Sequence, residues 1–327
     1  MALALPAVAL DEAALAHALE VVAETQPEAV ERARAALDVI LDGVRRSRWS
    51  DVAWCASALS PNGYPVQLVV DPAVNLGYVA EVAGPEAPVA DKLARALEVL
   101  DELGAPPVPG PCVDAVVAAQ RHGELRAGAW LGARHGSEGE EYTLYFEVPP
   151  GGEADLLAAL TPEPLLQPIS ALGRLQTVGI GAGTGRIEVY CACDSTDARL
   201  IDSGMHRLGL GERACDLISL VERTPVRPAS LLLERRSFGL AATIVDGRPE
   251  RFMVVVPARR LLGRDRDTRR RLLGLAAVEG WDLSIYAALT HPLEGASPPR
   301  VSVHGLIAWT VAAEGPPAIR VAFAPLC

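Results

Sequence analysis

The sequence predicts an α+β fold in which helices alternate with five two-stranded antiparallel hairpins, giving ten strands. Three observations support this fold. Paired runs alternate polar and apolar residues, turn-forming residues separate the two runs of a pair, and segments with helical spacing lie between the pairs. The clearest pair spans residues 177–191, where Arg186, Glu188 and Tyr190 share one face and the residues between them are apolar.

The predicted elements follow one another along a single expected domain, residues 1–327. Residues 1–50 are expected to form N-terminal helices interrupted at Pro27, and residues 51–327 to hold the five hairpin repeats with their intervening helices. The hairpins are expected to pair 65–70 with 76–82, 128–134 with 142–148, the two halves of 177–191, 239–245 with 251–256, and 303–312 with 318–323. Helices are expected at 89–103, 197–222 and 265–278.

Turn residues set the boundaries of these elements. Gly104 and the proline-rich stretch 105–111 end the helix after the first hairpin, and Asp246-Gly247 is a strong two-residue hairpin turn. The alternate glycines of 179–185 are followed by a strand rather than a helix, so we interpret them as a hairpin and not as a nucleotide-binding loop. The mixed-charge run 264–271 is expected to be a solvated helix face.

The polar row Arg186, Glu188 and Tyr190 has two structural interpretations. In an open sheet with helices on its apolar face, the row would face solvent. In a closed barrel with helices outside, it would line a chamber, and ten strands are enough to enclose a ligand-sized space.

Composition excludes several classes of function. The net charge of −11 and pI near 5.1 argue against nucleic acid or an anionic membrane as a partner. No apolar run is long enough to span a bilayer, and the apolar residues 1–10 lack the basic region of a signal peptide, so we expect a cytoplasmic protein. Cys191-x-Cys193 lacks the second ligand pair that structural zinc requires, so no metal site is expected.

The region of the first hairpin resembles the opening of the indole and aromatic prenyltransferases. Residues 63–68 read Gly-Tyr-Pro-Val-Gln-Leu and residues 77–81 read Gly-Tyr-Val-Ala-Glu, against the family's approximate Gly-x-Pro-x-Glu-Leu and Arg-Tyr-x-x-Glu. The order of hairpins and helices also fits that family's ABBA barrel. The resemblance implies a closed ten-stranded antiparallel barrel with helices outside, an aromatic small-molecule substrate, a prenyl diphosphate co-substrate and no obligatory cofactor.

Several charged groups of the family's site are replaced in this chain. The family's catalytic glutamate falls on Gln67, whose neutral amide can orient a ring N–H but cannot accept its proton. The first diphosphate-binding arginine falls on Gly77. The family's Lys-x-Tyr appears as Thr143-Leu144-Tyr145, and its Arg-x-Lys-x-Tyr appears as residues 186–190 with Glu188 in place of the lysine.

Prenyl transfer requires positive charge around the diphosphate leaving group. The fourth repeat, residues 252–256, contributes no basic or tyrosyl group to this set. Arginines on other strands would have to supply the charge. The candidates are Arg126, Arg134, Arg235 and Arg320.

The candidate site is the polar row that a barrel would enclose. Glu188, Tyr190 and Gln67 are the predicted catalytic residues, with Glu188 as an acid or base. The predicted substrate-binding residues are Arg186, Tyr145, Thr143, Glu147, His304 and Trp309.

Three functions remain open on these residues. The resemblance implies an aromatic (indole- or tryptophan-type) prenyltransferase-like enzyme of natural-product biosynthesis. The replaced charges favour a repurposed barrel that performs acid–base cyclisation, isomerisation or rearrangement without prenyl diphosphate. The joint loss of several family groups would also fit a homologue that binds ligand without catalysis.

Overall fold

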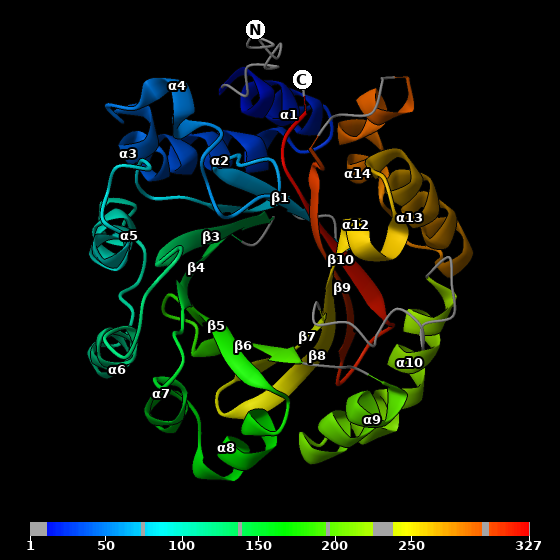
Figure 1. Ribbon diagram of the computed structural model, residues 1–327. Coiled ribbons are helices and arrows are strands. Elements are labelled where there is room, and N and C mark those ends of the chain that lie inside the picture. Colours follow the sequence, from blue (N-terminus) through cyan, green and yellow to red (C-terminus); the bar gives the residue numbers. More distant parts are fainter. Residues whose placement is uncertain are drawn as a thin grey trace, which may run out of the picture.

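The computed structural model describes residues 12–72, 76–136, 139–193, 197–224, 238–295 and 301–326. Ten strands form one closed barrel in which each strand pairs antiparallel with its neighbours in sequence, and β1 (Val66–Val70) closes the ring against β10 (Ala318–Phe323). Figure 1 shows the barrel surrounded by helices. The predicted fold, a ten-stranded antiparallel barrel with helices outside, is confirmed.

The other strands lie within or close to the predicted runs. They are β2 (Leu76–Ala80), β3 (Ala129–Gly136), β4 (Gly139–Glu147), β5 (Arg174–Gly181), β6 (Arg186–Cys193), β7 (Phe238–Val245), β8 (Arg248–Pro257) and β9 (His304–Ala312). At the β7–β8 turn, Asp246 and Gly247 have φ of 48° and 75°. Two consecutive positive φ values are typical of the tight turn that Asp-Gly favours.

The helices form the outer layer (Figure 1). Before the barrel come α1 (Glu12–Ala23), α2 (Pro27–Ile40), α3 (Asp42–Arg45) and α4 (Ser50–Ala53). Between hairpins lie η1 (Val89–Asp91), α5 (Lys92–Glu102), α6 (Gly110–Gln120), α7 (Glu153–Leu160), α8 (Glu163–Ser170), α9 (Ala198–Arg207), η2 (Gly211–Arg213), α10 (Ala214–Arg223), α12 (Ala258–Leu262), α13 (Asp265–Glu279), α14 (Ser284–Leu289) and η3 (His291–Glu294). Pro27 opens α2, where its missing N–H costs no helical bond.

The barrel wall has two different faces. Residues that point outward, such as Val189, Leu240 and Val254, belong to one large apolar core shared with the helices. Residues that alternate with them point inward. A smaller, separate apolar cluster on the inner face joins Ala241 and Met253 to Tyr190.

The barrel has two distinguishable ends because every connection within a hairpin lies at one of them. We call this the turn end; the Asp246–Gly247 turn is an example. The opposite end, where odd-numbered strands begin and the chain leaves for the helices, is the helix end. Register shifts interrupt the alternation between Thr243 and Ile244 and between Val321 and Phe323.

Candidate active site

Glu188 on β6 is the centre of a buried polar cluster inside the barrel. Its Oε1 accepts hydrogen bonds from Arg186 Nη2 at 2.6 Å and Nε at 3.1 Å, and its Oε2 accepts from the hydroxyls of Tyr145 and Tyr190, each at 2.8 Å. Burial alone would raise the pKa of Glu188, but the charges of Arg186 and Arg320 outweigh it and hold the pKa well below its usual range. The carboxylate is therefore ionised at any physiological pH.

Four arginines from four different strands converge on this region. They are Arg134 (β3), Arg186 (β6), Arg251 (β8) and Arg320 (β10), and we call them the arginine cluster. Burial, followed by repulsion from Arg320 and Arg186, lowers the pKa of Arg251 to about 10, and Glu250 offsets part of this effect. Burial and repulsion from Arg320 also lower the pKa of Arg134. Such mutual repulsion indicates a concentration of positive charge.

Two carboxylates form ion pairs with the arginine cluster within the described residues. Asp71 Oδ2 lies 3.7 Å from Arg134 Nη2 and 3.6 Å from Arg320 Nε, and Glu188 Oε1 lies 4.0 Å from Arg320 Nη1. Four guanidinium groups therefore meet these two carboxylates, and a third carboxylate, Glu141, also lines the cavity beside them. Around the cluster, the four arginines outnumber these three carboxylates by one, although the whole chain is acidic.

Several buried polar atoms on the inner face have no hydrogen-bond partner in the part of the chain that the structure describes. They are Nε and Nη2 of Arg320 and the hydroxyls of Thr243 and Thr310. A buried unsatisfied polar group costs about 1–3 kcal/mol, more if charged, and its persistence requires a reason. Unpaired donors beside a surplus of guanidinium groups are what an anionic ligand needs.

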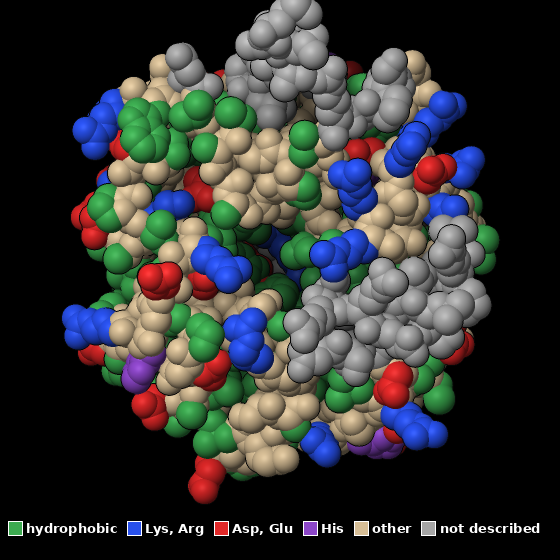
Figure 2. Space-filling view, viewed as in Figure 1, with side chains coloured by type: hydrophobic (Ala, Val, Ile, Leu, Met, Phe, Trp, Pro, Cys, Tyr) green, Lys and Arg blue, Asp and Glu red, His purple; other side chains and the backbone are tan. Residues whose placement is uncertain are grey.

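Arg320, with Arg134 and Arg186 of the cluster, borders a cavity of about 60 Å³. Figure 2 shows a face of the molecule that is hollowed at its centre, with basic side chains around the hollow. The residues lining the cavity are Val69, Asp71, Gly77, Tyr78, Val79, Gly132, Ala133, Arg134, Glu141, Thr143, Tyr145, Arg186, Glu188 and Arg320.

The Tyr145 ring is seated between two glycines. A Cβ at either Gly132 or Gly179 would lie 2.6 Å from the ring, so only glycine leaves room for it on both neighbouring strands. The ring of Tyr190 lies 6.3 Å away in an edge-on arrangement. Tyr190 also packs against the apolar inner cluster formed by Ala241, Met253, Val255 and Ala308, and Arg320 is paired across strands with Ala308 of that cluster.

The structure brings together five of the predicted site residues. Arg186, Glu188, Tyr145 and Thr143 line the cavity, and Tyr190 bonds to Glu188. Gln67 on β1 is also buried on the inner face. Its amide lies against Gly305, where an added Cβ would be only 2.4 Å from Gln67 Nε2.

Glu147 was predicted to bind substrate, but the structure gives it another role. Its Oε2 accepts hydrogen bonds from the backbone N–H groups of Arg126, Ala127 and Gly128 at 2.7, 2.8 and 3.2 Å. This arrangement fixes the entry into β3. Three backbone donors therefore occupy this oxygen, and Glu147 does not line the cavity.

His304 and Trp309 were predicted to lie in the pocket wall, and their positions correct this prediction. Both lie on the outer face of the barrel. Trp309 is fully buried, and its Nε1 donates to Thr224 Oγ1 at 2.8 Å. The register shift between Val321 and Phe323 turns His304 toward the helices.

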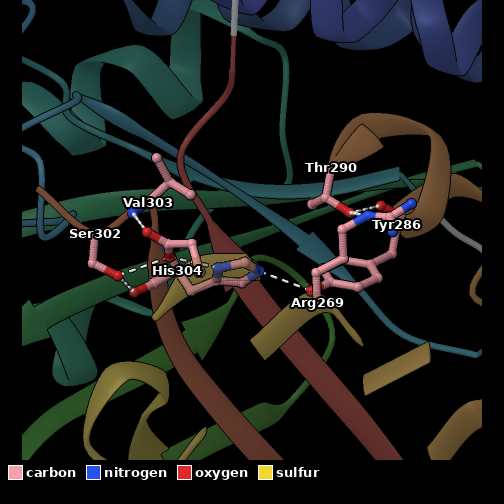
Figure 3. A network of polar contacts seen from close by, with 7 residues as sticks. Arg269, Tyr286, Thr290, Ser302, Val303 and His304 are labelled. Atoms are coloured by element: carbon pink, nitrogen blue, oxygen red, sulfur yellow. Dashed lines mark hydrogen bonds and ion pairs between the residues drawn. The ribbon is translucent and has the colours of Figure 1, made fainter. Parts of the chain in front are cut away.

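His304 belongs to a closed network between β9 and the outer helices (Figure 3). Its Nδ1 lies 2.7 Å from Asp265 Oδ1 and its Nε2 lies 2.8 Å from the Tyr286 hydroxyl. The hydroxyl of Ser302 and the backbone N–H groups of Val303 and His304 also donate to Asp265. Asp265 is thus buried, which corrects the prediction of a fully solvated 264–271 run.

Sequence reasoning missed one member of the arginine cluster, Arg251, and one carboxylate partner of the cluster, Asp71. Arg251 precedes the 252–256 run that was interpreted as lacking a basic group, and Asp71 was not considered. The sequence did contain a signal for Arg251, because residues two apart on a strand share a face and Arg251 therefore lies on the same face as Met253 and Val255. Arg134 and Arg320 were named as candidates and do face the chamber.

The other candidate arginines do not join the cluster within the described residues. Arg126 is exposed at the helix end, and Arg235 lies outside the described residues. No group of three or more His, Cys, Asp or Glu side chains in the described ranges is arranged to hold a metal ion. Among the helices described, none combines the length and apolarity needed to cross a membrane.

Comparison with solved structures identifies the fold. No protein-family model and no curated protein sequence matches the chain. It is similar to 5-dimethylallyltryptophan synthase from Streptomyces coelicolor (TM-score 0.73, 16% identity, 95% of each chain covered). It is also similar to 6-dimethylallyltryptophan synthase from Micromonospora olivasterospora (0.73, 15%, 95% of this chain and 96% of that one) and to AnaPT from Neosartorya fischeri (0.66, 14%, 98% and 95%). The chain therefore has the barrel fold of the indole prenyltransferases.

Proposed function

We propose that this protein is an aromatic prenyltransferase-like enzyme that binds an allylic prenyl diphosphate on the arginine cluster and transfers the prenyl group to an aromatic ring. The observation that carries the proposal is the surplus of guanidinium groups from four strands facing one chamber. The comparison with the Micromonospora enzyme, described in complex with DMASPP and Trp, supports the same ligand classes.

The arginine cluster suits the bond-breaking step. When the allylic C–O bond breaks, negative charge develops on the diphosphate, and pre-placed cations stabilise it without reorganisation. Arg320 contributes Nε and Nη2, which have no hydrogen-bond partner in the described part of the chain, and Arg251 contributes a cation that its neighbouring arginines repel and a bound anion would stabilise. The faces of Tyr145 and Tyr190, beside this cluster, can stabilise the allylic cation.

The ring proton is the remaining requirement of the reaction. Formation of the new carbon–carbon bond leaves a proton on the ring carbon, and the Gln67 amide cannot take it. Released diphosphate, held on the arginines, serves as the base that takes this proton. Gln67 then serves to hold the acceptor by hydrogen bonding.

The geometry argues against the acid–base alternative centred on Glu188. A carboxylate that accepts four hydrogen bonds and whose pKa is held far below neutral is a poor proton acceptor. Its contacts instead fix Arg186 and the two tyrosines in place. The third possibility, a protein that binds these ligands without catalysis, is distinguished by the test below.

The test is turnover with dimethylallyl diphosphate and a panel of aromatic acceptors that includes indole and L-tryptophan, with EDTA present. Release of diphosphate together with an acceptor heavier by one dimethylallyl group, seen by mass spectrometry, is the expected result. The double variant Arg251→Met/Arg320→Met should abolish it. Binding of both substrates without any product would contradict the enzyme and leave the binding homologue.

A further inference from the structure

Trp130 on β3 is an aromatic side chain on the inner face, and it was not among the residues predicted to form the site. It shares that face with Gly132 and Arg134 by strand alternation. Its neighbours on the outward face, Ala129 and Leu131, are fully buried, whereas Trp130 is partly exposed. A large flat ring therefore faces the chamber from this strand.

A buried ion pair fixes the Trp130 ring. The Trp130 Nε1–H donates to Glu81 Oε1 at 3.2 Å, the Ser57 hydroxyl donates to the same oxygen at 2.6 Å, and Lys92 Nζ lies 2.7 Å from Glu81 Oε2. The Glu81 side chain is 3% exposed and that of Lys92 is 10% exposed. Lys92 is the single lysine of the chain. An indole has one donor, so this bond restricts the rotation of the ring.

The position of Trp130 links the two halves of the chamber. Trp130 is paired across strands with Tyr145, whose hydroxyl bonds to Glu188 beside the arginine cluster. On its other side, Gln67 of β1 pairs with Val79 of β2 and Val79 pairs with Gly132, so this inner row lies two residues along β3 from Trp130. An aromatic acceptor over Val79 would reach Trp130 with its face and Gln67 with its edge.

We infer that Trp130 is the ring against which the aromatic acceptor packs, and that Glu81, held by Lys92 and Ser57, is the residue that positions it. The inference rests on the proposed function, since it places the acceptor next to the diphosphate site. Aromatic pairs gain stability beyond the area they bury, and a ring already fixed in place loses less entropy when a ligand stacks on it.

The test uses two ligands so that acceptor and diphosphate binding are measured separately. Indole and dimethylallyl thiolodiphosphate are titrated calorimetrically into the full-length protein and into Trp130→Leu, Trp130→Phe and Glu81→Gln. Trp130→Leu should weaken indole binding about 10-fold or more, with Trp130→Phe and Glu81→Gln between it and wild type. Affinity for the thiolodiphosphate should stay the same in all of them.

Trp281→Phe is the matched control, because Trp281 is also partly buried and its Nε1 donates to Pro317 O at 3.1 Å outside the barrel. It should leave both affinities unchanged. For Glu81→Gln, the ratio of prenylated regioisomers should also broaden, which a loss of stability alone would not produce.

Unchanged indole affinity in folded Trp130→Leu, or a wild type that binds the diphosphate but not indole, would overturn the inference. Failure of the wild type to bind the thiolodiphosphate while indole still depends on Trp130 would instead overturn the proposed function. In that case the assignment of Trp130 to the aromatic ligand stands.

Discussion

Each face of the barrel wall is in contact with a buried carboxylate, and the two carboxylates differ in the charges that surround them. On the outer face, Asp265 meets a set of donors that is complete, and even the far nitrogen of His304 is bonded to Tyr286. On the inner face, Glu188 is equally saturated, but the arginines around it outnumber their partners.

This difference distinguishes polar groups that only stabilise the fold from polar groups that can bind a ligand. A closed network stabilises the fold and offers nothing to a ligand, whereas Arg320, Thr243 and Thr310 keep unpaired buried atoms at a cost to stability. Such a cost is typical of sites that are completed by a ligand. Breaking the outer face should therefore affect stability alone, and changing the inner face should affect binding as well.

The largest effect is expected from Asp265→Ala on the outer face. Removal of this carboxylate leaves His304, the Ser302 hydroxyl and two backbone N–H groups without their acceptor. The free energy of unfolding should fall by about 3–5 kcal/mol, measured by urea denaturation. Diphosphate affinity, measured where the variant is still folded, should be unchanged. A specific loss of that affinity would contradict the separation of the two faces.

The next effect is expected from Glu188→Gln on the inner face. The neutral amide leaves the repulsion within the arginine cluster uncompensated, so unfolding should become easier by about 2–4 kcal/mol. Diphosphate at 100 times its Kd should restore about 2.7 kcal/mol, seen as a rise in Tm. Diphosphate binding should persist. Complete loss of turnover with binding intact would return Glu188 to the role of acid or base.

A pH effect of similar or smaller size is expected from His135, also on the outer face. Burial, partly offset by Glu140 and reinforced by Arg32, lowers the pKa of His135 to about 4, and its Nε2 lies 3.1 Å from the Tyr78 hydroxyl. The unfolded chain, with an ordinary pKa near 6.5, binds more protons than the folded one between these values. Stability should therefore decline by about 2–3 kcal/mol as pH falls from about 6.5 to about 4.

The measurement is urea denaturation of wild type and His135→Gln across this pH range. The variant should lose most of the slope that the imidazole contributes, whereas other acidic groups contribute equally to both proteins. Identical slopes would show that His135 is not the group that titrates.

The smallest effect is expected from Trp309→Phe. The variant loses the hydrogen bond to Thr224 and a little buried area, so stability should fall by about 1–2 kcal/mol. Acceptor and diphosphate affinities should not change, because the ring lies outside the chamber. A change in either affinity would restore the original prediction that Trp309 forms part of the pocket.

Local sequence patterns predicted the hairpins because their signals are local. Asp246-Gly247 adopts the positive φ values that its residue types allow, and the alternation around Glu188 identifies the inner face correctly. Closure of the barrel was different. The pairing of β1 with β10 joins residues far apart in the sequence, and it was expected from the family resemblance rather than from any local pattern.

The errors arose where tertiary context overrides alternation. A register shift moves His304 to the outer face, and alternation counted along β9 cannot detect it. Asp265 lies in a run that alternates acids with arginines, a pattern typical of surfaces, and only its contacts with the segment around His304 bury it. The arginine cluster is assembled from four strands, so no single segment of sequence contains it.

The most direct test of the arginine cluster as a diphosphate site is calorimetric titration of dimethylallyl diphosphate, with EDTA present, into wild type and into Arg251→Met/Arg320→Met. The matched control is Arg266→Met/Arg270→Met, which removes the same charge from exposed positions on α13. We expect micromolar affinity for wild type and control and a loss of about 100-fold or more in the inner-face variant. No binding to wild type, or equal binding to all three proteins, would contradict the assignment of the arginine cluster as a diphosphate site.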